Sequence, residues 1–293
     1  MRTLFSGALA PLLALALAGC IVEQPYPQSS DYQYQPAASS APAPMADQTE
    51  AEEQASEPPP PLPEYDQPPC PVEGYIWTPG LWRFGPEGYF WVPGTWVAPP
   101  QPGLLWTPGY WGVMGAVYVF HPGHWGEHVG YYGGINYGAG YDGDGYHGGR
   151  WVNNRFQYNT SVTRVNVTTV HSTYNERVVR NVTMPNTNIG RPAYVGGVGT
   201  RAQPMPRETQ WSREPRFAPT APQLQHHIDA RSEPTFNAAR NQGHPPVAAT
   251  PHPSAFRDPG TTAAKPVGPA YHPQGPAPRE EKPAHEGERD RGH

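Results

Sequence analysis

Tyr75-Ile76-Trp77-Thr78-Pro79-Gly80-Leu81-Trp82 is the first of four stretches that repeat one aromatic pattern. The other three are Tyr89-Phe90-Trp91-Val92-Pro93-Gly94-Thr95-Trp96, Leu104-Leu105-Trp106-Thr107-Pro108-Gly109-Tyr110-Trp111 and Tyr118-Val119-Phe120-His121-Pro122-Gly123-His124-Trp125. They begin at residues 75, 89, 104 and 118 and hold seven of the nine tryptophans. Self-similarity at so regular a spacing indicates an internal structural repeat.

Each stretch has the features of a short strand with a turn signal. In the first, Tyr75 and Trp77 alternate, so both point to one face of a strand. Pro79-Gly80 suits the central positions of a type II turn, while a proline in a sheet marks a turn, an edge or a bulge. Two alternatives stay open, a tight turn between very short strands or a bulge inside longer ones. Both predict a small antiparallel meander with aromatic cross-strand pairs, each contributing roughly 0.2–1 kcal/mol.

The first twenty residues have the features of a secretory signal. Arg2 precedes an almost wholly apolar run from Leu4 to Leu17, which is shorter than the roughly 20 apolar residues of a membrane-spanning helix. The run ends in Leu17-Ala18-Gly19-Cys20, which resembles the lipobox of bacterial lipoproteins. The resemblance implies cleavage between Gly19 and Cys20 and acylation of the Cys20 thiol and amine. Two or three acyl chains give a lasting membrane anchor, whereas one holds only marginally.

The residues around the two cysteines carry further expectations. Ile21, rather than Asp, follows Cys20, and resemblance to Gram-negative lipoproteins then implies the periplasmic face of the outer membrane. The alternative is a plain signal peptide with Cys20 in a disulfide. If Cys20 carries lipid, Cys70 has no partner within the chain. We expect Cys70 to be a linker thiol, with an intermolecular disulfide as the alternative.

Composition divides the chain around the repeats. The 32 glycines and 41 prolines make up about a quarter of the 293 residues, which is near the threshold of low complexity. Such segments bury too little apolar surface to offset their ordering entropy. The predicted fold is therefore mainly β with long disordered flanks. Five segments follow: a signal peptide (1–19), the lipidated cysteine with an acidic proline-rich tether (20–73), the four repeats (74–125), a Gly/Tyr-rich loop with Val/Thr/Asn-rich strands (126–198) and a proline-rich, mostly disordered tail (199–293).

Two elements are predicted outside the repeats. The β-branched residues after Trp151, as in the run 162–168, favour one or two further strands. In the tail, residues 221–233 predict one short helix. Thr220 would cap this helix, Pro222 is tolerated in its first turn, and Pro234 would end it.

The aromatic motifs resemble the YXWGXW, or WXXGXW, repeat proteins of proteobacteria. Leu104 and Phe120 depart from the first of these patterns. The stretches 131–138 and 151–174 also look like that family, so the resemblance extends over roughly residues 74–257. It implies an architecture and a location in the envelope, but no activity.

The sequence offers no convincing catalytic or metal site. His121, His124 and His128 would share one face of a helix, but Pro122 and Gly123 argue against a helix there, so incidental histidines are favoured over ligands. Asp142-Gly143-Asp144-Gly145 lacks the remaining ligands of a calcium loop, which leaves a flexible Gly-rich loop as the favoured interpretation. No cofactor is expected. The nearly balanced charges of the tail argue against a nucleic-acid partner.

The indole rings are the remaining candidates for binding. Rows of aromatic rings on a sheet can stack on sugars, and this makes candidates of Trp77, Trp82, Trp91, Trp96, Trp106, Trp111 and Trp125. The favoured alternative is that these rings hold a small Gly-rich sheet together. We therefore expect a non-enzymatic envelope lipoprotein with a structural or interaction role, anchored in a membrane and contacting an envelope glycan or another envelope protein. The alternative is a peptidoglycan- or polysaccharide-binding module, and an enzyme would need a site that the sequence does not reveal.

Overall fold

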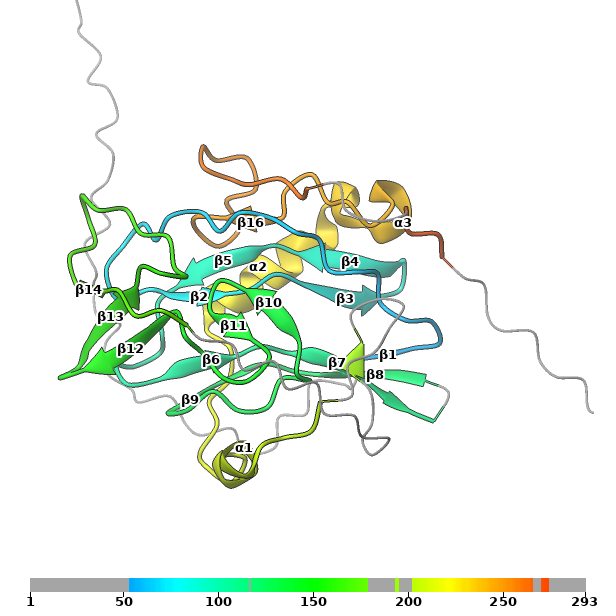
Figure 1. The fold of residues 1–293 in the computed structure, drawn as a ribbon. Helices are drawn as coiled ribbons and strands as arrows, with labels where there is room; N and C mark the ends of the chain where they lie inside the picture. Colours follow the sequence, from blue (N-terminus) through cyan, green and yellow to red (C-terminus); the bar gives the residue numbers. More distant parts are fainter. Residues whose placement is uncertain (1–52, 116, 179–192, 195–201, 266–269, 274–293) are drawn as a thin grey trace, which may run out of the picture. The chain divides into compact units, whose positions relative to one another are not determined.

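A computed structural model describes residues 53–115, 117–178, 193–194, 202–265 and 270–273. The described chain is mainly β, as predicted, with small sheets and few helices (Figure 1). Its strands are β1 (Gln54–Ala55), β2 (Ile76–Thr78), β3 (Leu81–Gly85), β4 (Gly88–Val92), β5 (Gly94–Val97), β6 (Leu105–Thr107), β7 (Tyr110–Met114), β8 (Val117–His121), β9 (His124–Gly126), β10 (Asn136–Gly138), β11 (Tyr141–Asp142), β12 (Gly149–Val152), β13 (Arg155–Asn159), β14 (Thr173–Tyr174), β15 (Ala193–Tyr194) and β16 (Ala249–Thr250). Its helices are α1 (Pro206–Trp211), α2 (Ala221–Ser232), a 3-10 turn (Pro234–Phe236) and α3 (Ala238–Asn241).

The four aromatic motifs form two long antiparallel hairpins rather than one continuous meander. In the first hairpin, β2 pairs with β5 and β3 pairs with β4. In the second, β6 pairs with β9 and β7 pairs with β8. Each hairpin therefore contains two motifs, one on each arm.

The Pro-Gly pairs are neither tight turns nor bulges. Thr78 lies opposite Thr95 and Leu81 opposite Val92, so the register runs across Pro79-Gly80 with no inserted residue. Because proline has no N–H, the strand ladder is interrupted here. Tyrosines from elsewhere satisfy the exposed backbone groups. The Gly80 amide donates to the Tyr65 hydroxyl at 2.9 Å, and the Tyr137 hydroxyl donates to the carbonyl of Gly109 at 2.6 Å in the second hairpin.

The spacing of five between the two tryptophans of a motif places their rings on opposite faces of the hairpin. Trp77 pairs with Trp96 at a ring separation of 5.3 Å, and Trp82 pairs with Trp91 at 5.1 Å. The glycine of each motif makes room for an aromatic ring of the other arm. A Cβ on Gly80 would lie 2.3 Å from Cζ2 of Trp91. The predicted aromatic cross-strand pairs are thus confirmed.

Two hydrophobic cores result from this arrangement. The pairs near the open ends of the hairpins, Trp77–Trp96 and Trp106–Trp125, join a core that includes Cys70, Val170 and several buried tyrosines. The pairs nearer the hairpin turns, Trp82–Trp91 and Trp111–Phe120, join a second core with Ala55, Ala230, Phe236 and Ala238. In Figure 1 the hairpins lie one above the other, and α2 packs against β4.

The flanks contribute more to the fold than composition predicts. Buried indole N–H groups need acceptors, and the flanking segments supply them for four of the seven repeat indoles. Trp82 donates to the carbonyl of Pro61 at 3.0 Å, and Trp96 donates to that of Pro68 at 2.9 Å. Trp91 reaches the carbonyl of Ala248 at 3.1 Å. The described parts of the expected tether (53–73) and tail (202–265) are therefore packed against the repeats.

The segment expected to be a Gly/Tyr-rich loop is largely part of the core. Tyr132 and Tyr141 are fully buried, and the Tyr141 hydroxyl donates to the carbonyl of Trp106 at 2.8 Å. The strands of this region include β10 and β11, which pair with each other, and β12 and β13, which are joined by Asn153 and Asn154 with positive φ. Residues 162–168, which composition marked as strand, contribute only an isolated bridge to Cys70.

The predicted helix is confirmed as α2, one residue shorter than expected. The side chains of Thr220 and Gln223 form a capping box, and Glu233 follows the last turn. Among the described residues, no helix has the length and apolar character needed to cross a membrane.

Candidate functional site

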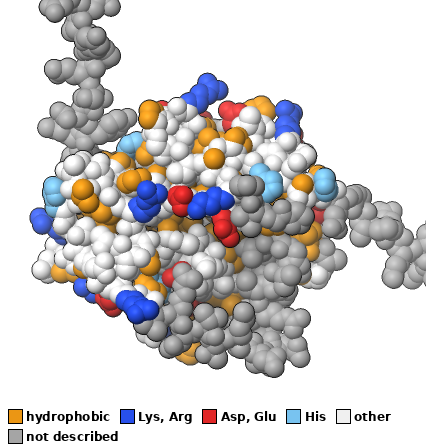
Figure 2. All heavy atoms as spheres, turned by 45° about the horizontal axis from the view of Figure 1, so that its top comes forward, with side chains coloured by type: hydrophobic (Ala, Val, Ile, Leu, Met, Phe, Trp, Pro, Cys, Tyr) orange, Lys and Arg blue, Asp and Glu red, His pale blue; other side chains and the backbone are white. Residues whose placement is uncertain are grey.

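The indole rings proposed for glycan stacking are all buried. Trp106 is the most accessible at 7% exposed, and four of the seven are at 0%. They lie in pairs on both faces of each hairpin, so they form no aligned row. The interpretation of these rings as a glycan platform is therefore wrong. On the face shown in Figure 2, apolar side chains occur in small groups among polar ones. The seven buried rings that were candidates for glycan stacking are those of Trp77, Trp82, Trp91, Trp96, Trp106, Trp111 and Trp125.

Of the two cysteines, the structure describes only Cys70. Gly19 and Cys20, the expected cleavage and lipidation residues, lie outside the described residues. Cys70 is fully buried in a core, and its thiol donates to the carbonyl of Val72 at 3.2 Å. Burial raises the pKa of this thiol to about 12. Cys70 is thus a core residue, which contradicts both the linker thiol and the intermolecular disulfide.

The three histidines singled out in the sequence line one cleft of about 350 Å³, although they share no helix. This cleft, here called the hairpin-2 cleft, lies between the second hairpin and the segment carrying α1. In Figure 1, α1 lies beside β9 on the side away from the first hairpin. Its lining includes Tyr110, His121, His124, His128, Tyr131, Glu208, Trp211 and Arg216.

Aromatic contacts organise the hairpin-2 cleft. The ring of His121 stacks on Tyr110 at 4.5 Å, because the two residues are cross-strand partners in β8 and β7. Tyr131 packs edge-on against Tyr110 at 5.5 Å. His128 stacks on Trp211 at 4.6 Å and forms a 2.9 Å contact with the carboxylate of Glu214. Tyr110, Tyr131 and Trp211 are partly exposed, unlike the repeat indoles.

The electrostatics of the hairpin-2 cleft favour neutral imidazole at His124. Burial, and to a smaller extent the charge of Arg216, lowers the pKa of His124 to about 4. Burial also raises the pKa of Glu208, which is 2% exposed and whose Oε1 has no hydrogen-bond partner among the described residues. The Arg216 guanidinium donates to the carbonyl of Ser212 at 3.1 Å and forms no ion pair within the described part of the chain.

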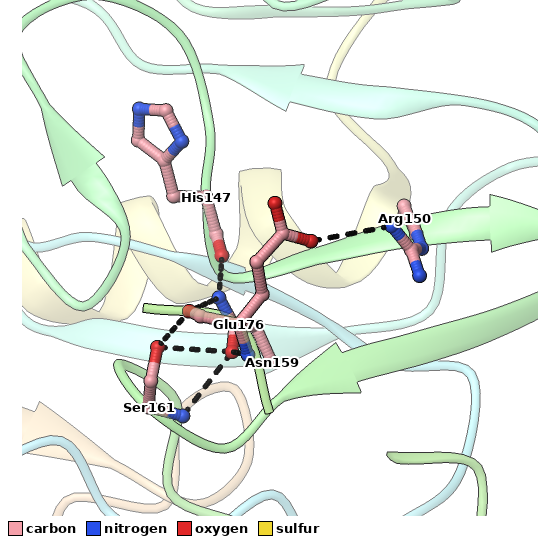
Figure 3. A network of polar contacts seen from close by, with 5 residues as sticks. All are labelled: His147, Arg150, Asn159, Ser161 and Glu176. Carbon is pink, nitrogen blue, oxygen red and sulfur yellow. Dashed lines mark hydrogen bonds and ion pairs between the residues drawn. The ribbon is translucent and has the colours of Figure 1, made fainter. Parts of the chain in front are cut away.

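A second polar cluster has a structural role. The buried amide of Asn159 donates to the carbonyls of His147 and Glu176 and accepts from the Ser161 hydroxyl (Figure 3). Arg150 approaches the Glu176 carboxylate at 3.4 Å. These bonds use both the N–H donor and the oxygen acceptor of the amide, so Asn159 holds the 172–178 segment against the end of β13.

The described residues hold no group of three or more His, Cys, Asp or Glu side chains placed to bind a metal. Asp142, Gly143 and Gly145 lie at the end of β11 and in the turn that follows, where the Gly143 amide donates to the Tyr132 hydroxyl at 2.8 Å. These residues therefore belong to a packed turn rather than to a flexible loop.

Sequence reasoning missed Trp211 and Arg216, which reach the hairpin-2 cleft from the tail. Tyr110 could have been found from the sequence, because the hairpin register makes it the partner of His121.

Comparison with known proteins identifies the repeat. No curated protein and no solved structure matches this chain. Residues 74–97 and 102–125 match the family model described as the WXXGXW repeat, in two copies. Each copy coincides with one hairpin, so the repeating unit is a pair of aromatic motifs joined across the Pro-Gly positions.

Proposed function

We propose that this protein is a non-enzymatic lipoprotein of the cell envelope in which the two WXXGXW hairpins form a rigid scaffold. The burial of all seven repeat indoles in cross-strand clusters carries this proposal. All seven rings are shielded from solvent and four of them are hydrogen-bonded to flanking segments, so they stabilise a fold rather than recognise a ligand directly.

The lipid anchor is supported by the sequence Leu17-Ala18-Gly19-Cys20 after a short apolar run. A tether between the anchor and the scaffold would hold the folded region away from the membrane. Residues 21–52 connect Cys20 to the first described residue of the folded region. The interaction role follows from this position, because partly exposed surfaces of the scaffold would face other envelope components.

Metabolic labelling tests the anchor. Cells expressing the wild-type protein, Cys20→Ser or Cys70→Ser would be grown with radiolabelled palmitate, and the membrane and soluble fractions separated. We expect label in the wild type and in Cys70→Ser, and none in Cys20→Ser, which should leave the membrane fraction. Equal labelling of Cys20→Ser would refute the anchor. Because Cys70 is buried, its variant is compared at equal amounts of folded protein.

In the polysaccharide-binding alternative, the ligand would have to contact a surface other than the repeat indoles, because those rings are buried. The hairpin-2 cleft favours it, because its aromatic rings are partly exposed and lie beside polar groups.

A further inference from the structure

The two hairpins share their Pro-Gly pairs and three of their four indole positions, but they differ at three of the four positions that flank the Pro-Gly pairs. Aligned on Pro-Gly, Leu81 of the first hairpin corresponds to Tyr110 of the second. Val92 corresponds to His121, and Thr95 corresponds to His124. The substituted residues are brought together by the register, since Tyr110 lies directly opposite His121. The second copy thus carries a local set of hydrogen-bonding rings on an otherwise repeated scaffold.

The surroundings of these positions differ as well. In the first hairpin, Leu81, Val92 and Thr95 face α2, and the remaining space has a volume of about 80 Å³. In the second hairpin, the substituted residues line the hairpin-2 cleft of about 350 Å³. Ligand pockets begin at roughly 300 Å³, so of these two equivalent sites the one on the second hairpin offers space for a small molecule.

The walls of the hairpin-2 cleft combine ring faces with hydrogen-bonding groups. Tyr110, Tyr131 and Trp211 supply partly exposed aromatic surface. The neutral imidazole of His124 can both donate and accept. Glu208 adds a buried carboxyl oxygen without a partner. A hydroxyl group, which also donates and accepts, complements these groups, and the apolar face of a sugar ring complements the aromatic rings.

Arg216 adds a single positive charge at the cleft. Within the described residues its guanidinium forms one hydrogen bond, to the Ser212 carbonyl, which leaves other N–H donors for a bidentate contact with a carboxylate. Neither of the two nearby acidic side chains forms an ion pair with Arg216 within the described residues. Glu214 contacts His128 instead, and burial raises the pKa of Glu208.

We propose that the hairpin-2 cleft binds a sugar that carries a carboxylate, with Arg216 holding the carboxylate and the Tyr110, Tyr131 and Trp211 rings contacting the sugar. Such a sugar occurs as an N-acetylmuramic acid of the cell wall or as a uronic acid of a polysaccharide. The inference deepens the interaction role proposed above but does not depend on the lipid anchor.

Isothermal titration calorimetry of the full chain in detergent at pH 7 tests the inference. The probes are glucuronic acid and N-acetylmuramic acid, with glucose and N-acetylglucosamine as neutral counterparts and acetate as the bare carboxylate. We expect at least one acidic sugar to bind at least tenfold more tightly than its neutral counterpart and than acetate. Whichever acid binds identifies the source of the ligand.

Two sets of variants locate the binding. Arg216→Gln should weaken it roughly tenfold, as expected for the loss of a charge-assisted contact, and Arg213→Gln, an exposed neighbour outside the cleft, should not. The triple variant Tyr110→Leu, His121→Val and His124→Thr gives the second hairpin the residues of the first. It should abolish binding while its circular dichroism spectrum remains that of the wild type.

Several results would overturn the inference. These are no saturable binding of either acid, equal binding of acids and neutral sugars, equal binding of acetate, or unchanged affinity in Arg216→Gln. If the triple variant unfolds, the comparison of Arg216→Gln with Arg213→Gln still tests the inference. Binding by a protein that takes up no palmitate would support this inference and refute the anchor.

Discussion

Gly94 lies against the indole of Trp77 so closely that a Cβ at Gly94 would stand 2.6 Å from Cζ2 of that ring. The same Cβ would lie 2.9 Å from the amide nitrogen of Gly80 on the other arm. Real Cβ atoms do not approach other heavy atoms so closely. The glycine of the motif is therefore a packing requirement imposed by the indole and by the opposite backbone.

The first prediction follows from this contact. Gly94→Ala should destabilise the protein by about 3 kcal/mol or more, because neither the fully buried ring nor the opposing strand has room to move. The free energy of urea unfolding measures the effect. Gly85→Ala in the same hairpin is the matched control, since its nearest neighbours would be at an ordinary 3.5 Å. Equal stability of the two variants would contradict the packing explanation.

A second prediction concerns the acceptor of a buried indole. Gln223 of α2 accepts from the Trp125 indole and from the Thr220 amide, both at 2.8 Å. Gln223→Ala leaves the indole N–H buried without an acceptor and removes the helix cap. The expected loss is about 1–3 kcal/mol in the free energy of unfolding. Gln225→Ala, on the exposed side of α2, should change stability by less than about 0.5 kcal/mol. A near-neutral Gln223→Ala would argue against the bond.

The repeat sequence predicts the strands, because an aromatic pattern at fixed spacing has a local physical meaning. It also contains the information that Trp77 and Trp82 face opposite ways, since five is an odd number of residues. The flanks could not be predicted in this manner. Pro61, Pro68 and Ala248 accept indole hydrogen bonds through backbone carbonyls, which every residue has, so their side chains carry no signal.

The repeat pattern also made part of the candidate site visible in the sequence. His121 and His124 stood out because they replace Val92 and Thr95 of the first hairpin. Their partners Trp211 and Arg216 lie about ninety residues further along the chain. Only the tertiary structure brings these residues to the second hairpin.

The third prediction concerns Cys70. Its thiol is fully buried, and its pKa is raised to about 12, so the reactive thiolate is scarce at neutral pH. In a Cys20→Ser background, a thiol reagent such as DTNB should not react with the native protein at pH 8 and should label one thiol per chain in 6 M urea. Rapid labelling of the native protein, or a disulfide-linked dimer on a non-reducing gel, would contradict the buried position.

The last prediction rests on His226, which fastens α2 to the first hairpin. This histidine is 3% exposed, and its Nε2 contacts the Pro93 carbonyl at 2.8 Å, so Nε2 carries the proton. Its Nδ1 therefore accepts, and the Ser254 amide donates to it at 2.8 Å. Protonation of Nδ1 would set two N–H groups against each other and break the second bond.

The direction of the pH effect follows from the pKa in the two states. Burial lowers the pKa of folded His226 from 6.5 to about 4, against the opposing effects of the Pro93 carbonyl and the Asp229 carboxylate. Between these values the unfolded chain binds a proton that the folded chain does not, so stability falls as the pH is lowered from about 6.5 to about 4. The lowered pKa values of His124 and His227 act in the same direction.

Urea unfolding at pH 7.5, 6 and 5 separates the contribution of His226. The wild type should lose stability over this range. The variant His226→Gln keeps a donor for the Pro93 carbonyl but does not titrate. Its free energy of unfolding should therefore fall less than that of the wild type, with a difference of up to about 1.4 kcal/mol per pH unit for the one proton that it does not bind. His171→Gln, at an exposed position, should follow the wild type. If His226→Gln shows the full pH dependence of the wild type, the effect arises from other histidines with lowered pKa values, such as His124, His227 and His252, and the His226 contact does not make α2 sensitive to acid.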